Sequence, residues 1–425
     1  MGPSAGRGRD RRVDPARGGA RRLLPGGRAS PHGYRGSGER RARPEREPGP
    51  RGAEAGDPRG GYSPAPPGRE LSGRGETDVR VGLGLDFTLG LGLEEQGLVA
   101  REAAELGYAE IWTPEGTGLD SFQLCALRWR ASAQVAAGGL GTGIAVSPVA
   151  YRTPMAFAMS AGTLGALTGG RFVLGLGSGG LHRPDFRRAM GVRSGSPLAI
   201  MRDYLTAVRG LLAGETVDYE GASLSLSGQR LAIDPAPRTP VYLGALGPRM
   251  LELGGELADG ICLNWCSEGQ VARARRIVDR GAARAGRPPG AVPLVEYIRV
   301  SVDDDVAAAR RALARATLGY ALGPREAVRD RRFAYRAHFE RMGFSGELAE
   351  LDARRDHGAS DEEIAGEISD ELLLNVGYFG AAEGAREHLA RLARGLDVAL
   401  VRVVAARPGP GAVRAVMEAC APRLR

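Results

Sequence analysis

The chain has 425 residues, 43% hydrophobic and 5% aromatic, with a formal net charge of +8. This length suits one large domain or two ordinary ones. The net positive charge arises in residues 1–77, which contain 17 Arg and nine acidic residues. We therefore expect no basic nucleic-acid-binding surface on residues 78–425. Four scattered cysteines disfavour a disulfide framework. Since no apolar run reaches about 18 residues and no secretory signal is visible, we expect a cytoplasmic protein.

Residues 1–77 are rich in Arg, Gly and Pro and carry no periodic apolar pattern. Such a segment cannot bury enough surface to offset its ordering entropy, so we predict a disordered leader. This interpretation includes the case in which residues 1–77 are non-native sequence, added by the choice of an upstream start codon. The alternative is an RGG-like RNA-binding tail, which the scarcity of stacking aromatics disfavours.

From residue 78 to 425, apolar runs alternate with helical patterns in a single predicted domain. Eight strands are expected, at 79–87, 110–113, 141–147, 172–176, 241–245, 261–265, 293–300 and 400–405. A small hairpin near residues 224–231 and a helical insertion at about 320–375 interrupt the alternation. Eight alternating units predict an α/β fold of the (β/α)8 TIM-barrel type, with an open Rossmann sheet as the alternative.

In such a barrel, functional residues lie at the carboxyl ends of the strands. That rule selects a set of strand ends and following loops before any family is considered. The set comprises Asp86, Glu115, Gly143–Tyr151, Gly177–His182, Ala245–Arg249, Asn264 and Glu296–Arg299.

Three glycine-containing stretches are candidate binding surfaces. Gly175–Gly180 matches G-x-G-x-x-G, which is weak evidence in a fourth β-α unit and equally fits a tight packed turn. Gly244–Arg249 opens a helix with glycine, proline and arginine, which favours a phosphate over simple capping. Gly143–Ile144 indicates a bulge against a flat ligand or close packing inside the barrel.

Two residues are candidates for proton transfer. Glu115 follows the second strand and suits a general acid or base, or a solvated loop carboxylate. His182 is the one histidine predicted in a strand-end loop, where a surface role is the alternative. No metal-ligand spacing and no G-x-S-x-G motif is present, so neither a metal nor hydrolysis is expected.

The stretches TLGALTGGRFVLGLGSGG, VYLGALGPRMLELGGELADG and LVRVVAARPG resemble the luciferase-like monooxygenase superfamily, and within it the branch that uses coenzyme F420. The resemblance covers residues 79–422. It implies a homodimeric barrel and a non-proline cis peptide at Gly143–Ile144 behind the cofactor ring. It also implies that Gly177, Ser178 and Gly179 line the cofactor's chain. The phosphate would lie in the loop formed by Ala245, Leu246, Gly247, Pro248 and Arg249.

The resemblance further implies hydride transfer between F420 and a small organic substrate. Glu115 takes the family's position near the reactive ring, and either Glu115 or His182 handles the proton. Asp86, Trp112, Tyr151 and Trp265 are expected to contact substrate. Gly180 stands where some F420 enzymes have glutamate, which puts sugar-phosphate dehydrogenase chemistry in doubt. An FMN-dependent monooxygenase using reduced flavin and O2 is the first alternative. A non-catalytic cofactor-binding barrel with an RNA- or partner-binding tail is the second.

Overall fold

The computed structural model describes residues 79–192, 195–234, 239–323 and 335–422. The predicted leader lies outside these residues. Eight parallel strands form the barrel wall: β1 (Arg80–Gly84), β2 (Glu110–Thr113), β3 (Gly141–Pro148), β4 (Phe172–Gly177), β7 (Val241–Gly244), β8 (Gly260–Asn264), β9 (Leu294–Val302) and β11 (Val398–Val403). The order is β9-β11-β1-β2-β3-β4-β7-β8, and β8 pairs again with β9. This pairing closes the sheet, which confirms the barrel and excludes the open alternative.

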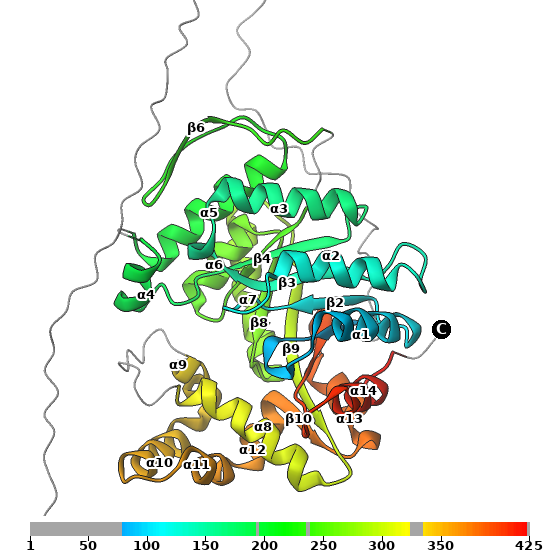
Figure 1. The fold of residues 1–425 in the computed structure, drawn as a ribbon. Coiled ribbons are helices and arrows are strands. Elements are labelled where there is room, and N and C mark those ends of the chain that lie inside the picture. The colour runs from blue at the N-terminus through cyan, green and yellow to red at the C-terminus, as the bar shows by residue number, and fades with distance from the viewer. Residues whose placement is uncertain (1–78, 193–194, 235–238, 324–334, 423–425) are drawn as a thin grey trace, which may run out of the picture. The chain divides into compact units, whose positions relative to one another are not determined.

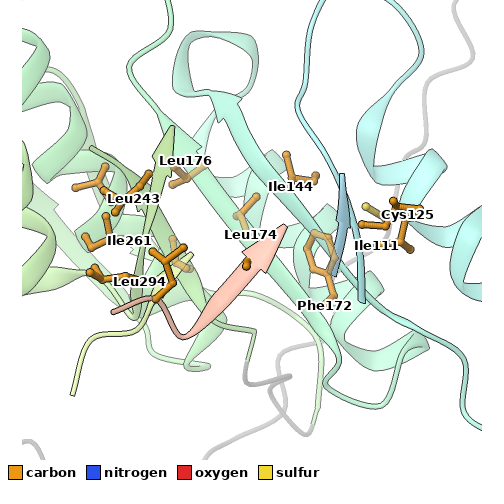
Figure 2. Packing of buried hydrophobic residues seen from close by; sticks show 14 of the residues in the cluster. Ile111, Cys125, Ile144, Phe172, Leu174, Leu176, Leu243, Ile261 and Leu294 are labelled. Atoms are coloured by element: carbon orange, nitrogen blue, oxygen red, sulfur yellow. The ribbon is translucent and has the colours of Figure 1, made fainter. Parts of the chain in front are cut away.

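The wall strands form where the sequence offers short apolar runs that can be buried on both faces. On β4, Phe172, Leu174 and Leu176 are fully buried and lie in the outer core together with Ile111 and Ile144 (Figure 2). The alternate positions of the strands face the barrel interior, because side chains alternate along a strand. That interior holds a separate cluster of Trp112, Ala145, Tyr242, Cys262, Val295, Tyr297, Val398 and Leu400.

Helices surround the strands (Figure 1). They are α1 (Leu93–Glu105), α2 (Ser121–Ser132), α3 (Pro154–Leu167), α4 (Pro184–Ala189), α5 (Pro197–Leu212), α6 (Pro248–Leu257), α7 (Glu268–Arg284), α8 (Val306–Ala321), α13 (Ala382–Leu392) and α14 (Pro410–Ala419). Two short 3-10 turns, η1 (Phe87–Leu89) and η2 (Val149–Tyr151), follow β1 and β3. Among the described helices, none is long and apolar enough to cross a membrane.

The predicted insertion is helical where the structure describes it. It contains α9 (Tyr335–Phe339), the π-helical turn η3 (Glu340–Phe344), α10 (Ser345–Asp356), α11 (Asp361–Glu367) and α12 (Asp370–Val376). These helices gather beside α8 (Figure 1) and share an apolar core with it. The sequence did not predict β10 (Gly377–Gly380), which follows the insertion and pairs with the carboxyl-terminal half of β9. The predicted hairpin is present as β5 (Val217–Glu220) and β6 (Ser225–Gln229).

Candidate functional site

A backbone irregularity in β3 marks one side of the barrel mouth. The register between β3 and β4 shifts between Ile144 and Ser147, and the peptide bond between Ala145 and Val146 is cis. The cis bond expected at Gly143–Ile144 is therefore wrong by two residues. Ile144 is fully buried in the outer core, so its side chain does not face the barrel interior. We call Ala145–Ser147 the β3 bulge.

Three glycines surround the side chain of Val146. A Cβ added at Gly177 would lie 2.3 Å from Val146 Cγ2. Cβ atoms at Gly175 and Gly244 would lie 3.2 Å and 3.0 Å from Val146 Cγ1. Since real Cβ contacts are rarely this short, β4 and β7 need glycine to make room for the β3 bulge. The G-x-G motif thus has a packing role in seating the bulge.

Gly143 has a similar steric reason to be glycine. Its added Cβ would lie 2.4 Å from the ring of Trp112. Trp112 is 1% exposed and donates its indole N–H to Glu110 Oε2 at 2.6 Å. The predicted substrate residue Trp112 therefore lies inside the barrel, where its ring occupies the space beside Gly143.

The loop after β4 contains the remaining predicted cofactor and catalytic residues. Gly179 has φ +51°, which favours glycine, and its added Cβ would lie 2.8 Å from Pro148 Cβ. Ser178 and Gly179 thus pass close to the end of β3. His182 is half-buried between this loop and α4. Nearby, Tyr151 packs its ring 6.3 Å from Phe186, centroid to centroid.

Glu115 is held in an ion pair. Arg152 donates from Nη1 and Nη2 to the two Glu115 carboxylate oxygens at 2.6 and 2.7 Å, and from Nη2 to Asp120 Oδ2 at 2.5 Å. Ser147 Oγ also donates to Glu115, and the Glu115 N–H donates to the Val146 carbonyl at 3.2 Å. The Glu115 side chain is 4% exposed. It therefore ties the loop after β2 to the β3 bulge, and proton transfer would have to compete with a bidentate guanidinium.

The predicted phosphate loop begins at the end of β7. Gly247 is the N-cap of α6, no side chain caps the helix, and Pro248 occupies its first turn. A Cβ at Gly247 would meet no heavy atom within 4 Å. Arg249 is exposed and forms no ion pair with any described carboxylate. Free helix N–H groups beside an open space and an available guanidinium suit a phosphate. Ala245 and Leu246 connect this turn to β7.

Across the mouth, Asp86 forms an ion pair with Arg402 of β11. Asp86 Oδ1 accepts the Thr88 N–H at 2.8 Å and caps η1. Burial alone would raise the pKa of Asp86, but the Arg402 charge and the Thr88 and Arg402 hydrogen bonds hold that pKa below its ordinary value. Arg402 was not among the sequence candidates. The sequence signal that could have identified Arg402 is a charged residue at an inward-facing position of an otherwise apolar strand.

Trp265, predicted to contact substrate, is fully buried at the end of β8 and has φ +57°. This conformation is unfavourable for a non-glycine residue. Two side chains from other elements contact the backbone at and next to Trp265. Cys266 N donates to Glu296 Oε1 at 2.6 Å, and His338 Nε2 lies 2.8 Å from the Trp265 carbonyl. Trp265 Nε1 has no hydrogen-bond partner among the described residues.

Glu296 and His338 have shifted pKa values in opposite directions. Burial raises the pKa of Glu296 to about 8, although the Cys266 N–H and the Arg299 charge oppose the shift. Burial, together with the Arg341 and Arg273 charges, lowers the pKa of His338 to about 4. Between about pH 7 and 8 Glu296 gives the larger difference in bound protons between the folded and the unfolded chain, because the unfolded carboxyl is already ionised and an unfolded histidine has lost most of its proton.

We therefore predict that the free energy of unfolding falls as pH rises from about 7 to 8, since the folded state binds the extra proton at Glu296. Glu296→Gln keeps an oxygen acceptor for Cys266 N and should remove this slope. Urea unfolding of both proteins at several pH values measures it. A slope that persists unchanged in Glu296→Gln would contradict the assignment.

The fold and this arrangement define a (β/α)8 barrel whose mouth carries a bulged third strand and an uncapped helix start. The chain belongs to the luciferase-like monooxygenase family, whose model matches residues 79–398. It is 31% identical over 278 residues to the 5,10-methylenetetrahydromethanopterin reductase of Methanolobus tindarius, covering 65% of this chain and 80% of the relative.

Solved structures agree on the fold. The coenzyme F420-dependent tetrahydromethanopterin reductase from Methanopyrus kandleri superposes with a TM-score of 0.65 at 20% identity, over 82% of this chain and 98% of that chain. The oxygenating constituent of 3,6-diketocamphane monooxygenase from Pseudomonas putida, in complex with FMN, superposes with a TM-score of 0.55 at 17% identity. That match covers 81% of this chain and 97% of the other.

Proposed function

We propose that this protein is an oxidoreductase that transfers a hydride between coenzyme F420 and a small organic substrate at the mouth of the barrel. The observation that carries the proposal is the pairing of the β3 bulge with the uncapped start of α6. The first offers a backbone surface for a flat ring, and the second offers N–H groups and Arg249 for a phosphate. The similarity to a methanopterin reductase supports the same chemistry.

The residues present fit this cofactor. Gly247 leaves open space where any other residue would place a Cβ, and Arg249 has no described carboxylate partner. Gly177, Ser178 and Gly179 would line the chain between ring and phosphate. When bound, F420 supplies a hydride donor or acceptor at its central ring carbon.

The protein's own residues would position the reactants and handle the proton. Because Glu115 is held by Arg152 and Ser147, we assign it to positioning the β3 bulge. His182, in the loop after β4, is the better candidate to hold or deliver the proton. Asp86, Tyr151 and Trp265 would border the substrate.

The alternative is an FMN-dependent monooxygenase, which the similarity to the FMN-bound diketocamphane enzyme favours. Fluorescence titration of the purified protein with oxidised F420 and with FMN separates the two. We expect saturable binding of F420. Binding of FMN without F420 would reject the proposed cofactor.

We predict that Arg249→Gln weakens F420 binding by about tenfold, because a charge-assisted hydrogen bond contributes roughly 1.5–3 kcal/mol and Arg249 is exposed. The loss should shrink in high salt. Arg414→Gln, which breaks the distant Glu102 ion pair, is the matched control and should bind normally. Equal affinity of Arg249→Gln and wild type would place the phosphate elsewhere.

We further propose that the enzyme is a cytoplasmic homodimer, as the family resemblance implies. Light scattering coupled to size-exclusion chromatography tests the oligomeric state. A monomer at micromolar concentration would reject this part of the proposal.

A further inference from the structure

Two arginines lie side by side in the barrel wall. Arg299 of β9 and Arg402 of β11 are register partners on adjacent parallel strands, and they are only 3% and 6% exposed. Neighbouring strands are about 4.8 Å apart, and like charges at such positions destabilise a sheet. The Arg402 charge contributes to lowering the pKa of Arg299 to about 10, although burial is the larger cause. This arrangement therefore calls for nearby negative charge.

The described carboxylates do not supply enough of it. Asp86 forms its ion pair with Arg402. Arg299 Nη1 donates to neutral acceptors, Asn264 Oδ1 at 2.5 Å and the Tyr297 carbonyl at 3.2 Å. No described carboxylate forms an ion pair with Arg299.

A third buried guanidinium group, that of Arg128, adds to the excess of positive charge. Arg128 is 1% exposed and donates from Nη2 to Gln96 Oε1 at 2.6 Å. Glu296 Oε1 accepts the Cys266 N–H, Glu296 Oε2 has no hydrogen-bond partner among the described residues, and neither oxygen forms an ion pair with a described arginine. Of the buried guanidinium groups of Arg128, Arg299 and Arg402, the described ion pairs therefore give a carboxylate partner to Arg402 alone.

Trp265 and Tyr297, whose rings lie beside the guanidinium groups of Arg299 and Arg402, each carry a polar group without a partner among the described residues. The Arg299 guanidinium lies 3.7 Å from the ring centroid of Trp265 and 5.3 Å from that of Tyr320. Trp265 Nε1 and the Tyr297 hydroxyl are buried with no hydrogen-bond partner in the described part of the chain. An anion would satisfy such donors. Tyr320 is 36% exposed, so one of the two rings beside the Arg299 guanidinium reaches the surface.

We propose that Arg299 binds an anionic group of the substrate, a carboxylate or a phosphate, at the ends of β8, β9 and β11. The inference rests on the proposed function, because it takes the barrel mouth as the substrate site. Trp265 would stack against the guanidinium and hold its plane toward the anion. The strained backbone of Trp265 then serves a binding role, since it places the indole against Arg299.

The test is an inorganic phosphate titration of full-length protein, followed by calorimetry and thermal unfolding. All proteins carry Arg249→Gln to remove the α6 site. We expect phosphate to bind and raise the Tm, and Arg299→Met to weaken binding by about tenfold or more. Without phosphate, Arg299→Met should match or exceed the parent Tm, because an uncompensated buried charge has been removed. Arg299→Lys should retain part of the binding, and Asp86→Asn should tighten it. Arg315→Met, which breaks an exposed ion pair with Glu362, is the control.

Three results would overturn the inference. The first is absence of phosphate binding in the Arg249→Gln parent. The second is a lower Tm of Arg299→Met without phosphate, which indicates a structural role. The third concerns Arg299→Met in a protein with Arg249 intact. If this variant loses F420 affinity as strongly as phosphate affinity, the anion that Arg299 binds is a group of the cofactor and not of the substrate. F420 titration of the wild-type protein does not depend on any of these three results. A failure of the anion-binding proposal can therefore be distinguished from a failure of the proposed function.

Discussion

Arg152→Met is expected to destabilise the protein by about 2–4 kcal/mol and to weaken F420 binding. Removing one partner of a buried ion pair leaves the other charge uncompensated, which typically costs 3–5 kcal/mol. The Glu115 side chain is 4% exposed, whereas Arg152 keeps 19% exposure, so we expect a cost at or somewhat below the lower end of that range. The freed Glu115 would also stop holding the β3 bulge. Urea unfolding and fluorescence titration measure the two effects.

The double variant Glu115→Gln/Arg152→Met provides the control for this prediction. It removes the Glu115 and Arg152 charges and leaves only Asp120, whose side chain is 38% exposed, so its stability should recover most of the loss, while the β3 bulge remains less well held. Glu115→Gln alone separates positioning from catalysis. A positioning residue changes F420 affinity, whereas a proton-transfer residue lowers kcat and leaves that affinity unchanged. The second pattern would return Glu115 to the catalytic role predicted from the sequence.

Gly177→Ala is expected to destabilise the protein by about 1–3 kcal/mol, the usual cost of overpacking, and to displace the β3 bulge. The added Cβ would lie 2.3 Å from Val146 Cγ2, so either strand must shift. Thermal unfolding and F420 titration measure the result.

Val146→Ala combined with Gly177→Ala should recover stability, because it removes the Cγ2 atom that the new Cβ meets. The matched comparison is Gly247→Ala, where the added Cβ meets no atom within 4 Å and stability should change little. If the double variant is no better than Gly177→Ala, steric conflict with Val146 is not the reason for glycine at 177.

The barrel was predictable because its wall strands are short apolar runs that recur between helical patterns. β4, with Phe172, Leu174 and Leu176 on one face, is typical. β10 was not predictable in the same way. It has four residues, directly follows a helix and contains two glycines, so it presents neither a continuous apolar run nor a clear alternation.

The site was only partly predictable, because the sequence shows which residues end a strand but not what lies across from them. Glu115 was located correctly after β2, but its partner Arg152 is 37 residues away. Gly177 was predicted to line the cofactor, and the structure adds a packing reason for glycine that the sequence does not show, because its added Cβ would meet Val146. In both cases the missing information was a tertiary contact.

The position of β10 links the substrate side of the barrel to the helices of the insertion. Arg299 is a register partner of both Gly377 in β10 and Arg402 in β11. The chain from α9 to α12 leads directly into β10, whose main chain is hydrogen-bonded to β9 at residues 299–302. The insertion is thus fastened to the strand that carries the proposed anion-binding residue. Ligand binding at Arg299 should therefore slow amide hydrogen exchange in residues 377–380.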